Sequence, residues 1–242
     1  MGTRRAVQQD RARATRRALL VTAGERFAVH GYHATSLSDL LRDEAVTKGA
    51  FYFHFPSKES LAEELVAAMS ESWELVVSAV RAHAADPLEA LVLLCDVVIV
   101  RLDDPVVRGA ARVLRDHVVR SPTLVEISTG WETENEDLLA AAAAQGLLRR
   151  GVDVGWAAHE IVTSLAGRRT LLDSLGSPEA LWPHMNEFWA GLLPLVAVES
   201  WCARWSARPW RRRARPVGVG PYDGGRVRLG EPGPPGPVPL PG

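Results

Sequence analysis

Three side chains in a short segment near position 50 are of types that hydrogen-bond nucleic acid. Thr47 supplies a hydroxyl, Lys48 an ammonium group and Tyr52 a phenol, and helical spacing is expected to turn all three outward. Such groups form hydrogen bonds with phosphate oxygens and with the edges of bases. Gly49, which follows Lys48, would let the backbone approach a bound molecule closely. The segment therefore predicts a contact surface for nucleic acid.

In a helix-turn-helix these side chains need a supporting helix, which holds the second helix by its apolar face while the other side enters the major groove. The support is supplied by three leucines on one helical face, Leu37, Leu40 and Leu41. Val46 and Ala50 on the reading helix face back toward them. The spacing thus predicts one helix that supports and one that reads.

The same region is predicted to hold three helices. The first runs from about residue 13 to residue 30 and ends at Gly31, in the C′ position that favours glycine. A second follows Thr35 or Ser36, either of which can serve as its N-cap. A tight turn then leads to the third, over residues 47–53. Three short elements joined in this way predict a helix-turn-helix.

The rest of the chain also shows helical spacing of its apolar residues, without the alternation that is typical of strands, so the predicted fold class is all-α. N-caps are predicted at Ser57, Asp86 and Asp153. The expected helices cover, approximately, residues 58–83, 87–102, 105 onward, 122–146, 153–175 and 178–205.

Charge is segregated along the chain, although the 28 basic and 29 acidic residues give a net charge of only −1. Residues 1–60 hold ten Lys and Arg against six acids, residues 61–203 hold ten against 21, and residues 204–242 hold eight against two. A basic end on an acidic body suggests that the end meets a polyanion. Nine Pro and eight Gly in residues 204–242 predict a disordered tail, and its Arg211–Arg215 cluster favours a solubilising role over a contact with DNA phosphates.

Several classes of protein are excluded by composition. Cys95 and Cys202 are 107 positions apart and predict neither a disulfide framework nor a metal site. No apolar run approaches the roughly 18 residues of a membrane span, and no secretory leader is visible, so a cytoplasmic protein without membrane contact is expected. His30, His33 and His54 fall on different elements, and nucleophile, phosphate-loop and dinucleotide motifs are absent, so neither an enzyme nor a cofactor is expected.

Residues 35–61, TSLSDLLRDEAVTKGAFYFHFPSKESL, resemble the DNA-binding signature of the TetR family. The version VTKGAFYFHF at residues 46–55 is most similar to the γ-butyrolactone autoregulator receptors of actinomycetes. Trp131, followed by Leu138-Leu139 and by Gln145-Gly146-Leu147-Leu148, resembles the tryptophan-bearing helix of the same receptors.

The resemblance implies a DNA-binding domain over residues 1–60 and a ligand-binding and dimerisation domain over residues 61–203. The family's DNA-contact positions fall on Thr47, Lys48, Gly49, Tyr52 and His54, with Thr35 or Ser36 and Lys58 near the phosphate backbone. Tyr52 and His54 have an alternative role, which is to pack the helix-turn-helix against the helix that begins at Lys58. The two roles are compatible.

For the ligand, the resemblance points to Trp131 as a pocket residue, with core packing as its alternative. Thr163 and Ser164 either hydrogen-bond a ligand carbonyl or back-bond to their own helix. The chain departs from the family at two positions. Ala45 stands where the turn usually has glycine, and Met69 stands where these receptors often carry glutamine. The second departure puts the identity of the ligand in question.

The function implied is that of a homodimeric transcriptional repressor, which binds palindromic operator DNA and is released by a small apolar effector of the γ-butyrolactone type. The dimer is expected to form through helices near residues 153–175 and 178–200, because bundle packing buries an apolar face that a monomer would expose. Two alternatives remain: a regulator that responds to an antibiotic or a biosynthetic intermediate, and a dimeric DNA-binding protein without an inducer.

Overall fold

The computed structural model of the chain describes residues 2–43, 46–71, 73–116 and 122–207. Regular structure in these ranges is helical, and the β-type pairing there is one isolated bridge between Leu148 and Ala197. The predicted all-α fold class is thereby confirmed. The expectations for the turn at Ala45 and for residues 208–242 of the predicted tail fall outside the described residues. Residues 204–207, where the disordered tail was predicted to begin, are helical instead, which corrects the prediction for these residues.

The helices group into two compact units. The N-terminal unit takes its described residues from positions 2–75 and 101–125, and the C-terminal unit from positions 76–100 and 126–207. The N-terminal unit is built from α1 (Gly2–His30), α2 (Leu37–Asp43), α3 (Lys48–His54), α4 (Lys58–Glu71) and α7 (Pro105–Arg115). The C-terminal unit contains all or most of α5 (Trp73–His83), α6 (Pro87–Arg101), α8 (Pro122–Ala144), α9 (Val154–Ser174), the 3-10 turn η1 (Pro178–Ala180), α10 (Leu181–Val196) and α11 (Glu199–Ala207).

The predicted helix ends are confirmed at several positions. Gly31 ends α1 with a φ of +81°, which glycine adopts without a steric penalty. Ser36 begins α2 with a reciprocal cap, in which its hydroxyl and amide donate to the Asp39 carboxylate while the Asp39 amide donates back to the hydroxyl. The side chains of Asp86 and Asp153 accept from backbone amides in the first turns of α6 and α9. Local sequence therefore determines these boundaries.

Other boundaries differ from those predicted. α1 begins at Gly2 rather than near residue 13, and residues 6–14 of this first half are exposed almost throughout, so they show no apolar period to detect. The segment predicted as one helix over residues 58–83 comprises α4 and α5, with residue 72 outside the described ranges. The last predicted segment comprises η1, α10 and α11.

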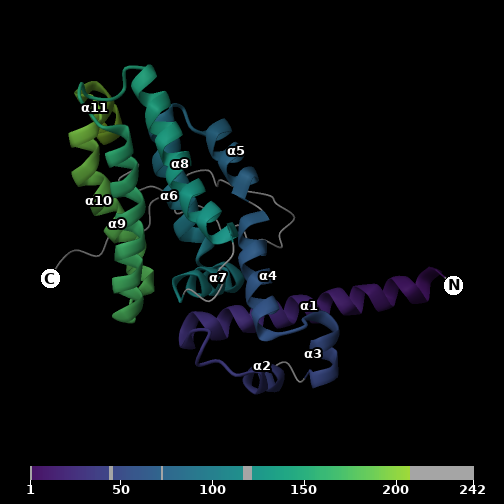
Figure 1. Cartoon of the computed structure of the whole chain (residues 1–242). Helices are drawn as coiled ribbons and strands as arrows, with labels where there is room; N and C mark the ends of the chain where they lie inside the picture. The colour runs from purple at the N-terminus through teal and green to yellow at the C-terminus, as the bar shows by residue number, and fades with distance from the viewer. Residues whose placement is uncertain (1, 44–45, 72, 117–121, 208–242) are drawn as a thin grey trace. The chain divides into compact units, whose positions relative to one another are not determined.

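Helix α7 holds the N-terminal unit together, although it lies far from α1 in sequence. The two helices cross at Gly24 and Gly109, so closely that a Cβ atom added to Gly109 would lie 2.4 Å from the Gly24 Cα atom. At the end of α7 the Asp116 carboxylate accepts from the Tyr32 amide at 3.2 Å. α4 also packs against α7 within this unit (Figure 1). The three helices form the base that carries α2 and α3.

Across the described ranges, none of the helices combines the length and the apolar character that a membrane span requires.

Candidate nucleic-acid interface

Helix α3 presents one face outward while a buried phenylalanine anchors it. Phe51 is fully buried and packs against Phe55, with ring centroids 5.9 Å apart. Lys48 and Gly49 are exposed, and a Cβ atom added to Gly49 would meet nothing within 4 Å. Thr47 is the N-cap, and its hydroxyl accepts from the Ala50 amide at 3.1 Å. The first turn of α3 is therefore capped, open and accessible to a large partner.

The second turn of α3 adds two exposed aromatic rings. Tyr52 is exposed as predicted, and its neighbour Phe53 is the most exposed large apolar residue of the described chain, with 79% of its surface accessible. Phe53 was not among the contact residues predicted from the sequence. An exposed apolar ring on a reading helix suits contact with a thymine methyl group. Phe53 therefore joins the candidate contact residues.

His54 lies at the edge of this surface. Its imidazole is half-buried, and burial lowers its pKa, with a smaller contribution from the positive charge of Arg16. The ring of His54 also packs against Phe53 and Phe55. The environment thus favours the neutral imidazole, which can donate one hydrogen bond but carries no charge toward a phosphate.

Of the two hydroxyl residues predicted near the phosphate backbone, only Ser36 is exposed. Thr35 is buried, and its hydroxyl donates to the Gly31 carbonyl at 2.8 Å. Thr35 therefore stabilises the end of α1 in this conformation.

Lys58 is engaged inside the N-terminal unit. Its ammonium group donates to the Tyr32 and Thr35 carbonyl oxygens, both at 2.9 Å, and lies 3.9 Å from the centroid of the Tyr32 ring. Partial burial lowers the pKa of this lysine. The side chain thus joins α4 to the loop after α1, and the predicted phosphate contact would have to use its remaining donor.

This geometry predicts that Lys58→Met lowers stability. The substitution keeps the aliphatic stem but removes two hydrogen bonds, which should cost about 1–3 kcal/mol because two partly buried carbonyls are deprived of a charged donor. Thermal unfolding followed by circular dichroism measures the change, with Glu59→Gln on the same helix turn as the control. Unchanged stability with weaker binding to every DNA duplex would instead assign Lys58 to phosphate contact.

Trp131, the first candidate ligand residue of the C-terminal unit, lies on α8. Trp131 is half-buried, and its carbonyl accepts from the Asn135 side-chain amide at 2.7 Å. Asn135 is fully buried, and its Oδ1 atom has no hydrogen-bond partner among the described residues. The indole nitrogen of Trp189 on α10 is buried in the same unpartnered way among these residues. Neither group could be predicted from the sequence, because a buried polar atom without a hydrogen-bond partner has no local sequence signature.

Of the other candidates, Thr163 and Ser164 belong to α9 and Met69 to α4. Thr163 is exposed, and its hydroxyl donates to the His159 carbonyl at 2.7 Å, so it back-bonds to its own helix. Ser164 is half-buried on α9, and Met69 belongs to the N-terminal unit, where its carbonyl accepts from Arg101 at 2.8 Å. Over the part of the chain that the structure describes, no group of three His, Cys, Asp or Glu side chains is placed to hold a metal ion.

Comparison with known proteins decides the family. The model of the bacterial regulatory proteins of the tetR family matches residues 19–65, which include α2, α3 and most of α4. The chain is also 30% identical to the TetR family protein CprB from S. coelicolor A3(2), with a TM-score of 0.75 over 83% of this chain and 97% of CprB. The chain belongs to the TetR family. The predicted resemblance of residues 35–61 is thus confirmed.

Two further similarities concern one branch of the TetR family. The crystal structure of an ArpA-like γ-butyrolactone receptor is similar over 81% of this chain and 94% of its own, with 28% identity and a TM-score of 0.71. The A-factor receptor protein of Streptomyces griseus is 25% identical over 200 residues, which are 78% of this chain and 66% of that protein. The chain spans just under two thirds of that relative and 42% of the Bacillus subtilis regulator YxaF.

Proposed function

We propose that this TetR-family protein is a homodimeric transcriptional repressor that binds palindromic operator DNA and is released by a small apolar effector. The observation that carries the proposal is the outer face of α3, where the exposed residues 47–49, 52 and 53 surround the buried anchor Phe51. A capped helix with a cation, a phenol and an apolar ring on one open face has the chemistry of base readout. The related protein CprB has been solved in complex with its biological operator sequence.

Homodimer formation is supported by the exposed faces of α9 and α10. Trp156 and Leu171 share one exposed face of α9, on which Gly167 and the back-bonded Thr163 also lie, and the C-cap residue Leu175 is exposed as well. On α10 the exposed residues include Ala190, Gly191, Pro194 and Leu195. Exposed apolar and small residues on two adjacent helices favour packing against a second copy in a four-helix bundle. Two recognition helices in such a dimer would be about 34–36 Å apart.

The effector that we propose first is of the γ-butyrolactone type, because two similar proteins are described as γ-butyrolactone and A-factor receptors. Release follows from linkage. An effector that binds more tightly to the dimer conformation unable to bind DNA lowers the affinity for the operator. The loss equals the difference between the effector's binding free energies for the two conformations. The second candidate is an antibiotic or a biosynthetic intermediate, and Met69 in place of the usual polar residue favours it.

Fluorescence anisotropy with the DNA upstream of the protein's own gene tests the proposal. Tight, sequence-selective binding that a γ-butyrolactone releases is the expected result. Tight binding that is indifferent to the lactone would retain the repressor and exclude that effector class. Equal binding to the upstream DNA and to an unrelated duplex would contradict operator recognition itself.

We predict that Trp131→Ala weakens the response to the effector while DNA binding persists, because Trp131 is half-buried and belongs to the C-terminal unit. Anisotropy titrations of the variant with DNA, and then with effector, separate the two properties. Val152→Ala, a half-buried residue of the same unit, is the control. Simultaneous loss of DNA binding and effector response in the Trp131 variant would assign this side chain to the core.

A further inference from the structure

The first 16 residues of α1 form a basic helical arm, defined here as residues 2–17. We infer that this arm binds the phosphate backbone of DNA beside the segment that α3 contacts. The inference rests on the proposed function for the identity of the partner. It adds a second contact surface, which neither the family model nor the helix-turn-helix includes, since the matched region begins at residue 19.

The arm has the composition of a polyanion-binding element. Residues 2–17 contain six arginines and one acid, Asp10. Side chains from position 6 to position 14 are exposed almost throughout, and Val7 is the one large apolar side chain among them. Arg11 and Arg13 are exposed. An exposed helix gains little stability from a protein core, and a partner outside the core would stabilise it.

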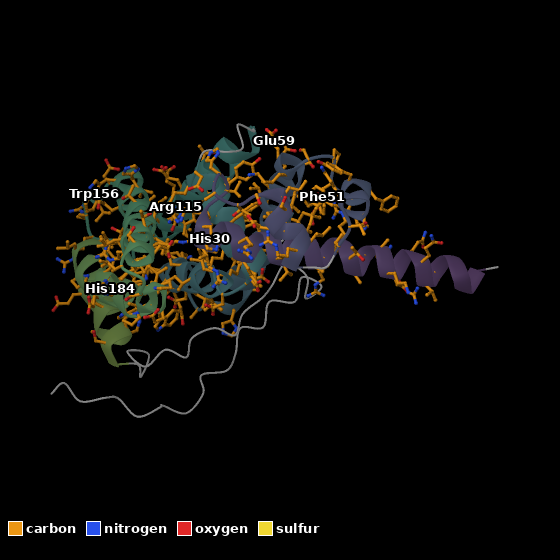
Figure 2. The ribbon with its side chains drawn as sticks, turned by 90° about the horizontal axis from the view of Figure 1, so that it is seen from below. His30, Phe51, Glu59, Arg115, Trp156 and His184 are labelled. Carbon is orange, nitrogen blue, oxygen red and sulfur yellow. The ribbon has the colours of Figure 1, made fainter. Side chains whose placement is uncertain are left out.

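The inner end of the arm lies next to the reading helix. Arg16 pairs with Glu64 at 2.7 Å, and its guanidinium carbon lies 5.1 Å from the centroid of the Phe55 ring. Phe55 is the C-cap residue of α3. The inner end of the arm therefore contacts the C-terminal end of α3. In both views the arm extends beyond the other helices of the N-terminal unit (Figures 1 and 2).

The reach of the arm suits DNA. At about 1.5 Å per residue, its 16 residues extend for about 24 Å. Phosphates of one strand follow one another every ~3.4 Å along the duplex axis, so the arm can span about seven base pairs. Arginine is the side chain that pairs with phosphate through two parallel hydrogen bonds. A membrane surface fits less well, because an interfacial helix needs an apolar face and Val7 is the single large apolar side chain of residues 6–17.

The test compares the full chain with its Arg11→Gln, Arg13→Gln variant. Anisotropy is measured from 50 to 300 mM salt, on the DNA upstream of the protein's own gene and on an unrelated duplex of equal length. Each phosphate that an arginine no longer neutralises lowers the slope of log affinity against log salt by about 0.9, so a decrease of about 1.8 per subunit is expected. Affinity at a physiological salt concentration should fall about tenfold on both duplexes, because phosphate contacts carry no sequence information.

Arg150→Gln, Arg204→Gln is the matched control, because it removes the same charge from two exposed arginines of the C-terminal unit. Hydroxyl-radical footprinting supplies a second measurement: wild-type protection should extend beyond the half-sites, and the arm variant should leave these flanks unprotected. A slope equal to that of the control, or unchanged flanks, would overturn the inference. A change in sedimentation without a change in slope would also overturn it, since the arm would then contact another copy.

The result can be separated from the proposed function. If wild-type protein binds both duplexes equally, operator recognition fails, yet the salt slope of the arm variant still reports its phosphate contacts. Conversely, if only the upstream DNA is bound tightly and the arm variant matches the control, the repressor proposal stands and the arm is excluded.

Discussion

Replacement of Gly109 by alanine is expected to lower the free energy of unfolding by about 3 kcal/mol or more. The added Cβ would lie 2.4 Å from the Gly24 Cα atom and 2.7 Å from its carbonyl oxygen. These are backbone atoms of α1, so the clash cannot be relieved by rotating a side chain, and the two helices must move apart. The same crossing is tight from the other side, since a Cβ on Gly24 would lie 2.4 Å from the Pro105 carbonyl oxygen.

Differential scanning calorimetry measures this effect as a fall of roughly 6–12 °C in melting temperature, at about 2–4 °C for each kcal/mol in a chain of this size. Gly130→Ala in α8 is the control, because its Cβ would meet nothing within 4 Å. That variant should equal or exceed the wild type by up to about 1 kcal/mol, since alanine is the better helix former. A Gly109 variant as stable as the control would show that α1 and α7 do not pack so closely.

The second large effect is expected from Lys48→Ala, which should weaken binding to the upstream DNA by about 1–3 kcal/mol, or roughly 5- to 150-fold. Lys48 is the first residue of α3 and is exposed, so its removal should leave folding intact. A cation that reads a base discriminates between sequences, and its loss should therefore relax base preference as well as affinity.

Anisotropy with a set of singly substituted duplexes distinguishes readout from simple attraction. Arg150→Ala controls for the loss of one positive charge, since Arg150 is exposed on the C-terminal unit. If the Lys48 variant binds every duplex more weakly by the same factor, the lysine contacts phosphate only. If its affinity is unchanged, α3 is not the reading helix.

The features predicted correctly from sequence are those encoded within a few residues. The caps at Ser36, Asp86 and Asp153, the end of α1 at Gly31 and the open face of α3 all depend on local hydrogen bonds or on helical period. Each is determined by residue type and spacing alone.

What could not be predicted depends on contacts between distant segments. The burial of Thr35 and the engagement of Lys58 arise from packing around the loop after α1. The close crossing of Gly24 and Gly109 joins positions 85 residues apart, and no spacing rule identifies such a pair. The helical arm before residue 13 could not be predicted for the opposite reason, because its residues 6–11 are exposed and leave no apolar period.

The double role of Thr47 restricts how the DNA preference of this protein can change during evolution. Its hydroxyl already accepts from the Ala50 amide as the N-cap of α3, while its position places it among the candidate base contacts. Only Ser, Asp, Asn and, at small cost, Gly can replace a threonine cap without losing about 1 kcal/mol. The neighbouring positions 48, 49 and 52 carry no such constraint. New operator preferences should therefore arise at those positions first, with position 47 drawn from a small set of residues.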